Sequence, residues 1–204
     1  GEIAAEFLAG DLEDVAAQFK EGGYEKNYAA GPMAQCKLDS VVVGLPQDTG
    51  PLVYYYNKAE FDKLGIKGPT NLDEFKAAAK TAAAQGKYIS AFETDEAQYG
   101  LSAQAAAAGG VWYKAENDKW TVKIDDASAK TVADFWQSML DDKTTFVTER
   151  WGDSFTKALT DKTLIGTIGA AWEAPLISGD LEKTDNKGEW AVAQLPDFGK
   201  GALT

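Results

Sequence analysis

The stretch TLIGTIGAAWEAPL, residues 163–176, decides the fold that the sequence predicts. Its first half is a short run of apolar and small residues, which is typical of a strand buried inside a sheet. The run ends at Trp172, which is followed at once by Glu173 and then by Pro175, at the start of an expected short helix. A large aromatic ring beside a carboxylate at the end of a strand belongs either to the packed core or to the floor of a binding site.

Strand-like and helix-like segments alternate on both sides of this stretch. Strands are predicted at residues 38–46, 51–58, 87–93, 163–170 and 189–196. Segments with apolar residues at helical spacing lie between them, and the clearest is 70–86, with Thr70 or Asn71 as its N-cap. This alternation predicts an α/β fold with a mostly parallel sheet.

A β-hairpin is expected at residues 111–124, because aromatic and β-branched residues flank a polar pair that favours a tight turn. Asn117 and Asp118 form the expected turn. Trp112 and Trp120 lie on the two arms, where we expect them to cover each other or an adjacent helix.

The composition excludes several classes of function. The chain has 204 residues, enough for one large domain or one and a half small ones, and a net charge of −12. Its basic residues are scattered among more numerous acidic ones, which disfavours nucleic acid as a partner. The sequence has no histidine, so the commonest general base and metal ligand is absent. The single cysteine, Cys36, forms no disulfide within the chain and is expected to be a small buried hydrophobe.

Motifs of catalysis and cofactor binding are absent from the sequence. It contains no P-loop, no GxGxxG after a strand, no GxSxG, no CxxC and no EF-hand loop. Carboxylates are plentiful, and a glycosidase needs only two that are correctly placed, so a carbohydrate-active enzyme remains the alternative function. Exposed acidic pairs are more often solvated surface, so we expect no enzyme, no cofactor and no metal site.

Three aromatic residues lie where strands or loops lead into helices: Trp172, Trp151 and Tyr99. In an α/β sheet, the loops at such junctions lie around the ligand-binding site. A sugar has C–H faces that stack on flat rings and hydroxyl groups that need fixed donors and acceptors. An acidic protein with aromatic rings at these junctions therefore fits a neutral carbohydrate, while core packing is the competing explanation for each ring.

Several segments together resemble one known family. VVVGLPQDTGPLVYYYNKAEFDKLGIKGPTNLDEFKAAAK, residues 41–80, resembles the part of extracellular sugar-binding proteins of ABC transporters in which the chain passes from the first lobe to the second. Leu72 stands where the family often has tryptophan. GTIGAAWEAPLI (166–177) resembles the later strand with its ligand-stacking tryptophan, and EWAVAQLPDFGKG (189–201) resembles the strand that returns to the first lobe. The order and spacing are those of the maltose-binding-protein-like members.

The resemblance implies a periplasmic-binding-protein-like fold, in which the second lobe is a three-layer α/β/α sandwich. It implies three parts: a partial strip of the first lobe at 1–46, the second lobe at 47–196, and the start of the return at 197–204. Since members of the family are nearly twice as long, the chain is expected to be a piece of a longer protein.

The implied function is non-catalytic binding of a sugar or oligosaccharide between two lobes, for delivery to the permease subunits of an ABC transporter. The resemblance also implies a monomeric, extracellular or cell-surface protein, anchored by a lipid, or a periplasmic one in a Gram-negative cell.

The site residues follow position by position. Trp172 matches the stacking tryptophan and Tyr99 a stacking tyrosine, and Trp151 lies within one position of another aromatic contact. Asp48 falls in the stretch after the hinge where members often place a polar sugar contact. Glu173, beside Trp172, is either an acceptor for a sugar hydroxyl or a carboxylate that complements the dipole of its own helix.

Overall fold

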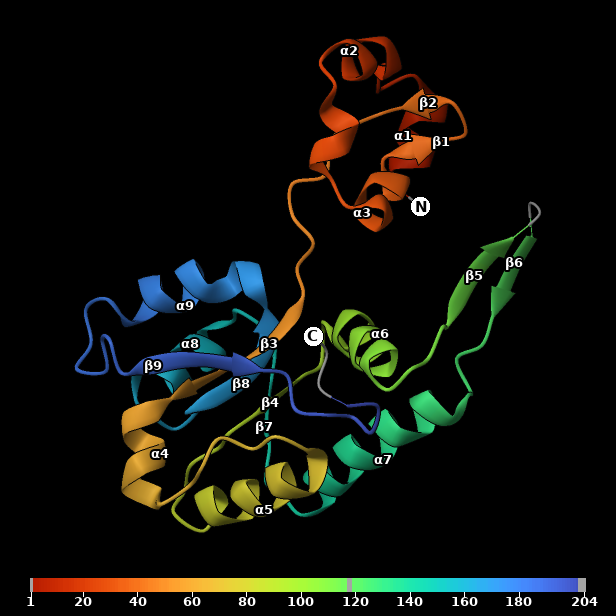
Figure 1. The fold of residues 1–204 in the computed structure, drawn as a ribbon. Coiled ribbons are helices and arrows are strands. Elements are labelled where there is room, and N and C mark those ends of the chain that lie inside the picture. Colours follow the sequence, from red (N-terminus) through yellow and green to blue (C-terminus); the bar gives the residue numbers. More distant parts are fainter. Residues whose placement is uncertain (1, 117–118, 202–204) are drawn as a thin grey trace. The chain divides into compact units, whose positions relative to one another are not determined.

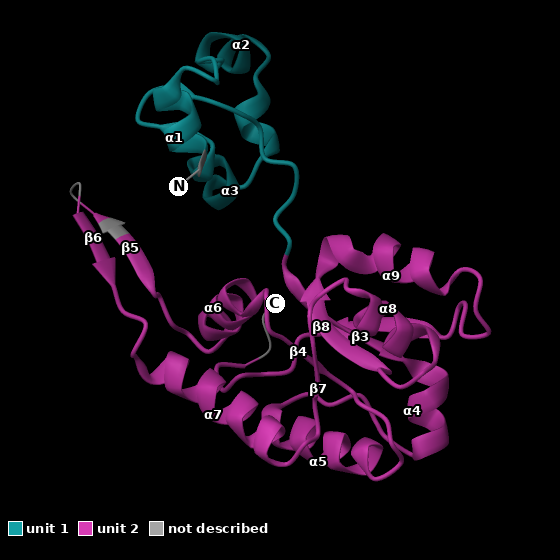
Figure 2. Ribbon diagram, turned by 180° about the vertical axis from the view of Figure 1, so that it is seen from behind, with its two compact units in different colours: residues 1–50 teal, residues 51–204 magenta. Residues whose placement is uncertain are grey.

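The computed structural model describes residues 2–116 and 119–201 and divides the chain into two compact units. Unit 1 is Gly1–Gly50 and unit 2 is Pro51–Thr204 (Figure 2). The expected assignment of 1–46, 47–196 and 197–204 to lobes of a larger protein stays a prediction.

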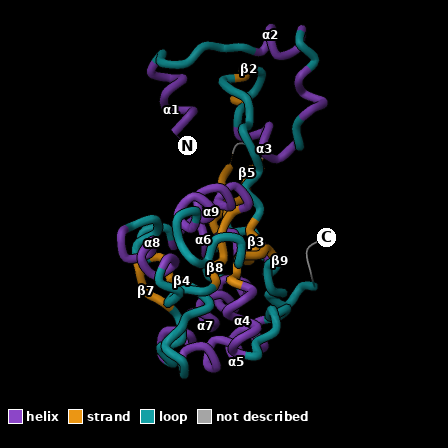
Figure 3. Tube along the Cα trace, turned by 90° about the vertical axis from the view of Figure 1, so that its left-hand side faces the viewer, coloured by secondary structure: helices purple, strands orange, loops and turns teal. Residues whose placement is uncertain are grey.

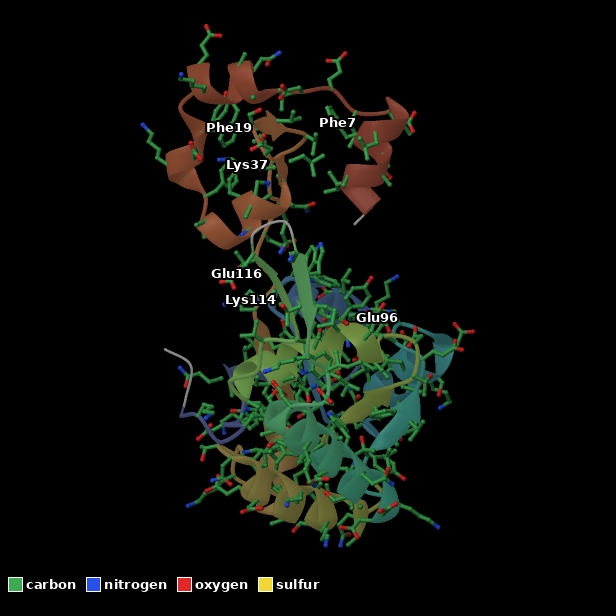
Figure 4. All side chains as sticks on the ribbon, turned by 90° about the vertical axis from the view of Figure 1, so that its right-hand side faces the viewer. Phe7, Phe19, Lys37, Glu96, Lys114 and Glu116 are labelled. Atoms are coloured by element: carbon green, nitrogen blue, oxygen red, sulfur yellow. The ribbon has the colours of Figure 1, made fainter. Side chains whose placement is uncertain are left out.

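Unit 1 is a small helical unit with one short pair of strands. Its elements are α1 (Glu2–Ala9), α2 (Ala16–Glu21), the 3₁₀ helix η1 (Tyr24–Asn27), α3 (Ala30–Gln35), β1 (Lys37–Leu38) and β2 (Val41–Val42). Phe19, labelled in Figure 4, packs with Met33, Cys36 and Val42 in its core. The prediction that Cys36 is buried is confirmed.

The strand predicted at 38–46 is much shorter in the structure. Only Val41 and Val42 pair, with Leu38 and Lys37, around Asp39, which has a left-handed φ of 57°. Residues 43–50 form no strand, since Pro46 has no N–H to donate to a neighbouring strand.

Unit 2 is built on a sheet whose central strand is β3 (Leu52–Asn57). β8 (Gly166–Ala170) and β9 (Trp190–Gln194) flank it, both antiparallel to it. β4 (Ala91–Glu93) and β7 (Phe146–Thr148) pair in parallel, and a parallel bridge between Tyr88 and Leu164 joins the segments that lead into β4 and β8.

The expectation of a mostly parallel sheet needs one correction. These pairings give β4, β7, β8 and β9 a common direction, and β3 runs against them. Because β3 lies between β8 and β9, both of its ladders are antiparallel. The period of a strand reports which face is buried and not which way the strand runs, so the sequence pattern held no sign of this reversal.

Helices cover both faces of this sheet (Figures 1 and 3). On one face lie α4 (Lys58–Leu64), α5 (Leu72–Ala83), α6 (Ala97–Ala107) and α7 (Ala127–Asp141); on the other lie α8 (Asp153–Thr160) and α9 (Ala174–Leu181). Tyr54 packs with the first group and its neighbour Tyr55 with the second, as the alternation of side chains along a strand requires. Unit 2 is therefore a three-layer α/β/α sandwich, as predicted.

Local signals set the helix boundaries. Asn71 is the N-cap of α5, where its side chain accepts a hydrogen bond of 2.9 Å from the backbone N–H of Glu74. Gly65 ends α4 with a φ of 66°, the left-handed conformation that glycine adopts without strain.

The predicted hairpin is formed by β5 (Tyr113–Glu116) and β6 (Lys119–Val122), and its expected turn at Asn117 and Asp118 lies outside the described residues. Lys114 and Glu116, which form an ion pair of 2.7 Å, lie on β5 (Figure 4). The expectation that Trp120 is covered by Trp112 or by a helix is wrong, because Trp120 is 73% exposed. Trp112 packs against the core of unit 2 because it precedes the paired part of the hairpin.

Candidate functional site

The candidate site lies at one edge of the sheet of unit 2, where three strands end together. Glu93, Thr148 and Ala170 are the last residues of β4, β7 and β8. Because these strands share a direction, their carboxyl ends meet at the same edge, which is where ligands bind in open α/β sheets. Each strand is followed by a loop, and these loops carry or lead to the aromatic residues predicted for the site: Trp151, Trp172 and, in the first turn of α6, Tyr99.

Arg150 connects these three loops. Its side chain is 6% exposed and makes ion pairs with Glu93, through Nη1, and with Glu173, through Nη2. Its backbone N–H donates a hydrogen bond of 2.8 Å to Oδ1 of Asp95. One residue therefore joins the end of β4, the loop after β7 and the turn after β8.

Glu173 fixes the turn that carries Trp172. Its carboxylate is 4% exposed, and Oε1 accepts a hydrogen bond of 2.7 Å from the backbone N–H of Ala170 while Oε2 faces Arg150. This bond closes the 3₁₀ helix η2 (Ala171–Glu173). The prediction of Glu173 as a direct sugar contact is untested, and its position within the turn gives it a structural task in any case.

Three further hydrogen bonds fasten the same turn to β3 and to the residue before it. The hydroxyl of Tyr55 donates to the carbonyl oxygens of Ala170 and Ala171, at 2.8 and 3.1 Å. The N–H of Ala171 donates to the carbonyl of Pro51 at 2.9 Å. Trp172 itself is 47% exposed, so its ring stands at the surface on a backbone that is held in place.

The carboxyl group of Glu93 is electrostatically perturbed. Burial raises its pKa, and although Arg150 acts in the opposite direction, the pKa remains above its ordinary value of 4.5. Glu96 and Asp95 add to the rise. The cluster holds one guanidinium against two carboxylates, so Arg150 offsets only part of the cost of burying the charge of Glu93.

Trp151 is half-buried and adopts a left-handed backbone conformation, with φ of 57°. This conformation is uncommon and costly for a bulky residue, and strained residues of this kind cluster at functional sites. Its ring packs edge-on against Phe155 at 5.2 Å, and the guanidinium of Arg150 lies 5.3 Å from the ring centre. Its indole N–H is buried and has no hydrogen-bond acceptor among the described residues.

Tyr99 and Asp48 occupy different surroundings. Tyr99 lies in the first turn of α6, three residues after Glu96, which is labelled in Figure 4, and is 68% exposed. Asp48 is an exposed residue of unit 1, in the stretch after β2, and makes no hydrogen bond or ion pair with another described residue. The structure thus brings the loops of Trp172, Trp151 and Tyr99 to one edge, whereas Asp48 belongs to the other unit.

Arg150 and Glu93 were not among the residues predicted for the site. One signal was available, since Arg150 is the only arginine in the chain and directly precedes Trp151. Glu93 ends a predicted strand but resembles any other carboxylate of an acidic sequence. Within residues 2–116 and 119–201, no cluster of acidic or cysteine side chains is arranged to hold a metal ion.

Unit 2 is a three-layer sandwich with exposed aromatic rings near the carboxyl edge of its sheet, the edge where ligands bind in open α/β sheets. The sequence matches the profile of the bacterial extracellular solute-binding proteins over residues 2–204, and the chain belongs to that family. None of the helices in the described part of the chain is both long and apolar enough to span a bilayer.

Two similar structures are of binding proteins in complex with sugars. The galacto-N-biose/lacto-N-biose I-binding protein of an ABC transporter from Bifidobacterium longum, in complex with lacto-N-biose, is 42% identical, with a TM-score of 0.84 over 97% of this chain and 53% of that one. A transporter-associated binding protein from B. animalis subsp. lactis, in complex with β-1,6-galactobiose, is 28% identical, with a TM-score of 0.82 over 94% of this chain and 47% of that one.

A more distant protein shares the same fold. Maltose-bound MalE3 of T. maritima is 19% identical, with a TM-score of 0.71 over 91% of this chain and 48% of that one. The chain thus spans about half the length of these proteins. The prediction of a maltose-binding-protein-like fold and of a chain shorter than its relatives is confirmed.

Proposed function

We propose that this chain is the sugar-binding part of a non-catalytic solute-binding protein whose ligand is a neutral disaccharide. The observation that carries the proposal is the exposed ring of Trp172 on a turn that is fixed by Glu173 and Tyr55. A flat ring on a rigid support is what stacking against the C–H face of a sugar requires, since little conformational freedom is lost on binding. Tyr99 provides a second exposed ring, in the first turn of α6.

The proposed ligand class follows from charge and from the similar structures. A net charge of −12 disfavours anionic ligands. Two similar binding proteins, 42% and 28% identical over the matched part, were solved with lacto-N-biose and with β-1,6-galactobiose. We therefore favour a galactose-containing disaccharide over a maltose-like one.

The arrangement of carboxylates supports binding over hydrolysis. Glycosidases place two carboxyl groups on either side of the scissile bond. In this chain Glu93 and Glu173 lie together, but both are paired with Arg150, and Glu173 also accepts a backbone hydrogen bond. Neither is free to attack a sugar or to protonate a leaving group.

In the cell, the complete protein would hand its sugar to the permease subunits of an ABC transporter. It would act as a monomer, outside the cytoplasmic membrane, where the proteins of its family work. Its attachment to the membrane by a lipid stays a prediction.

A fluorescence titration tests the proposal. The complete natural protein containing these residues is titrated with lacto-N-biose, β-1,6-galactobiose and maltose. We expect a change in tryptophan emission with one of the galactose-containing sugars, and Trp172→Ala should weaken binding at least about 30-fold, as expected for a stacking anchor. Trp120→Ala is the matched control, because that ring is also exposed but lies on the hairpin. An absence of binding to every sugar, or equal losses in the two variants, would refute the proposal.

A further inference from the structure

Arg150 is placed at the centre of the candidate site but does not belong to its exposed surface. Its side chain is buried, and its partners lie on two other loops that are distant in sequence: Glu93 and Asp95 before α6, and Glu173 before α9. Every other basic residue of the chain is a lysine. The residue type is therefore exceptional at the point where the three loops meet.

A guanidinium suits this position for a geometric reason. Its N–H groups form a planar fork, so Nη1 can bind Glu93 while Nη2 binds Glu173 in one fixed arrangement. A lysine ammonium is a single point of charge on a flexible stem and does not fix the angle between two carboxylates.

The cluster is poorly explained by stability alone. Removing an arginine and two carboxylates from water is costly, and buried ion pairs often contribute no more than a well-packed apolar group would. The next residue, Trp151, is held in the strained left-handed conformation. A strained backbone and a buried group of charges at the same place are typical of a functional site, where the surrounding structure holds them in a fixed geometry.

We propose that Arg150 is a positioning residue of the sugar site, which acts through Glu173 on the ring of Trp172 and through Glu93 and Asp95 on the loop that leads to Tyr99. The inference rests on the proposed function for the sugar but adds a separate claim about geometry. Glu173 transmits the effect because the same carboxylate that pairs with Arg150 closes the turn at Ala170.

Three variants test the inference, with sugar affinity and unfolding free energy measured on each. Glu173→Gln keeps an oxygen for the N–H of Ala170 but removes the charge that faces Arg150. Arg150→Lys keeps the charge but removes the fork. Glu93→Gln, which removes the other charge that faces Arg150, replaces either of these variants if it fails to fold. We expect each folded variant to bind its sugar at least about tenfold more weakly, the loss expected from a small misplacement of a binding group.

Glu60→Gln is the control for general destabilisation. Glu60 is also buried and paired with two lysines, Lys63 at 2.6 Å and Lys87 at 3.0 Å, but it lies on α4, at the opposite end of β3. We expect this variant to lose stability while its sugar affinity is unchanged.

A readout without sugar completes the test. The contribution of Trp172 to fluorescence quenching by acrylamide, obtained by comparison with Trp172→Phe, should change in Arg150→Lys and stay unchanged in Glu60→Gln. If the wild type binds sugar through Trp172 while the variants of the cluster bind equally well, the inference is overturned and the proposed function stands. If Trp172→Ala binds normally, the proposed function itself fails.

Discussion

Gly169 has no side chain at the place where the carboxylate of Glu173 lies. A Cβ atom on Gly169 would lie 2.9 Å from Cδ of Glu173 and 3.0 Å from Nη2 of Arg150. The backbone of Gly169 is extended, so the glycine is required here by space and not by φ. The small residue near the end of β8 thus leaves room for the ion pair that fixes the turn.

The first prediction concerns this contact. Gly169→Ala should lower the free energy of unfolding by about 1–3 kcal/mol, because the added methyl group overpacks a site bordered by a buried carboxylate and the guanidinium. Urea unfolding measures the change.

Gly179→Ala is the control for that substitution. A Cβ on Gly179 would meet no atom within 4 Å, and the residue lies inside α9. This variant should be as stable as the wild type or more stable by up to about 1 kcal/mol, since alanine is the better helix former. Equal effects of the two substitutions would contradict the role given to Gly169.

The second prediction concerns pH. The pKa of Glu93 in the folded protein lies above its ordinary value of 4.5 because burial outweighs the attraction of Arg150. The folded state therefore binds this proton more tightly than the unfolded state does. The resulting stability is fully present below the ordinary pKa and is lost as the pH rises through the folded pKa. Relative to Glu93→Gln, the wild type should lose unfolding free energy as the pH rises above the ordinary value of 4.5 and through the folded pKa.

The same substitution at Glu60 should give the opposite sign. Burial acts to raise the pKa of Glu60, but hydrogen bonds and charges from Lys63 and Lys87 outweigh it and lower the pKa. The stability from this group is present above the ordinary pKa and is lost as the pH falls through the folded pKa. Unfolding curves of the wild type and both glutamine variants, recorded below and above pH 4.5, measure the two slopes; slopes of the same sign would contradict the prediction.

The third prediction concerns the start of α5. Asn71→Ala should lower the free energy of unfolding by about 1 kcal/mol, because it removes the acceptor for the N–H of Glu74. Asn71→Asp retains an acceptor at the N-terminus of the helix and should keep most of the stability. Thermal unfolding of both variants provides the comparison, and an alanine variant as stable as the aspartate one would refute the cap.

The fourth prediction concerns a buried polar pair between α6 and α7. Nε1 of Trp136 donates a hydrogen bond of 2.7 Å to Oε1 of Gln104, and both side chains are buried. Trp136→Phe leaves the amide of Gln104 without its partner and should cost about 1–3 kcal/mol beyond the lost packing.

A double-mutant cycle isolates this pair. Gln104→Met alone leaves the indole N–H unpaired, and the variant with both substitutions removes both polar groups. We expect the double variant to be more stable than the sum of the single losses implies. Strictly additive losses would show that the hydrogen bond contributes nothing.

The sequence by itself determined the local elements of this protein. The apolar runs of β3 and β8 and the cap at Asn71, one of two candidates, are encoded by neighbouring residues, and all are formed as predicted. The resemblance of consecutive segments to one family identified the fold for the same reason, because order and spacing are properties of the chain. It also singled out Trp172 and Tyr99, whose rings are exposed at the edge of unit 2.

The contacts between these elements, by contrast, are a property of the tertiary structure. Glu93, Arg150 and Glu173 are separated by long stretches of sequence, and each alone resembles an ordinary surface charge. Their meeting depends on β4, β7 and β8 sharing a direction while β3 opposes them. The direction of each strand and the pairing of distant charges arise when the whole sheet packs together. The pattern of apolar residues along the chain does not encode either of them.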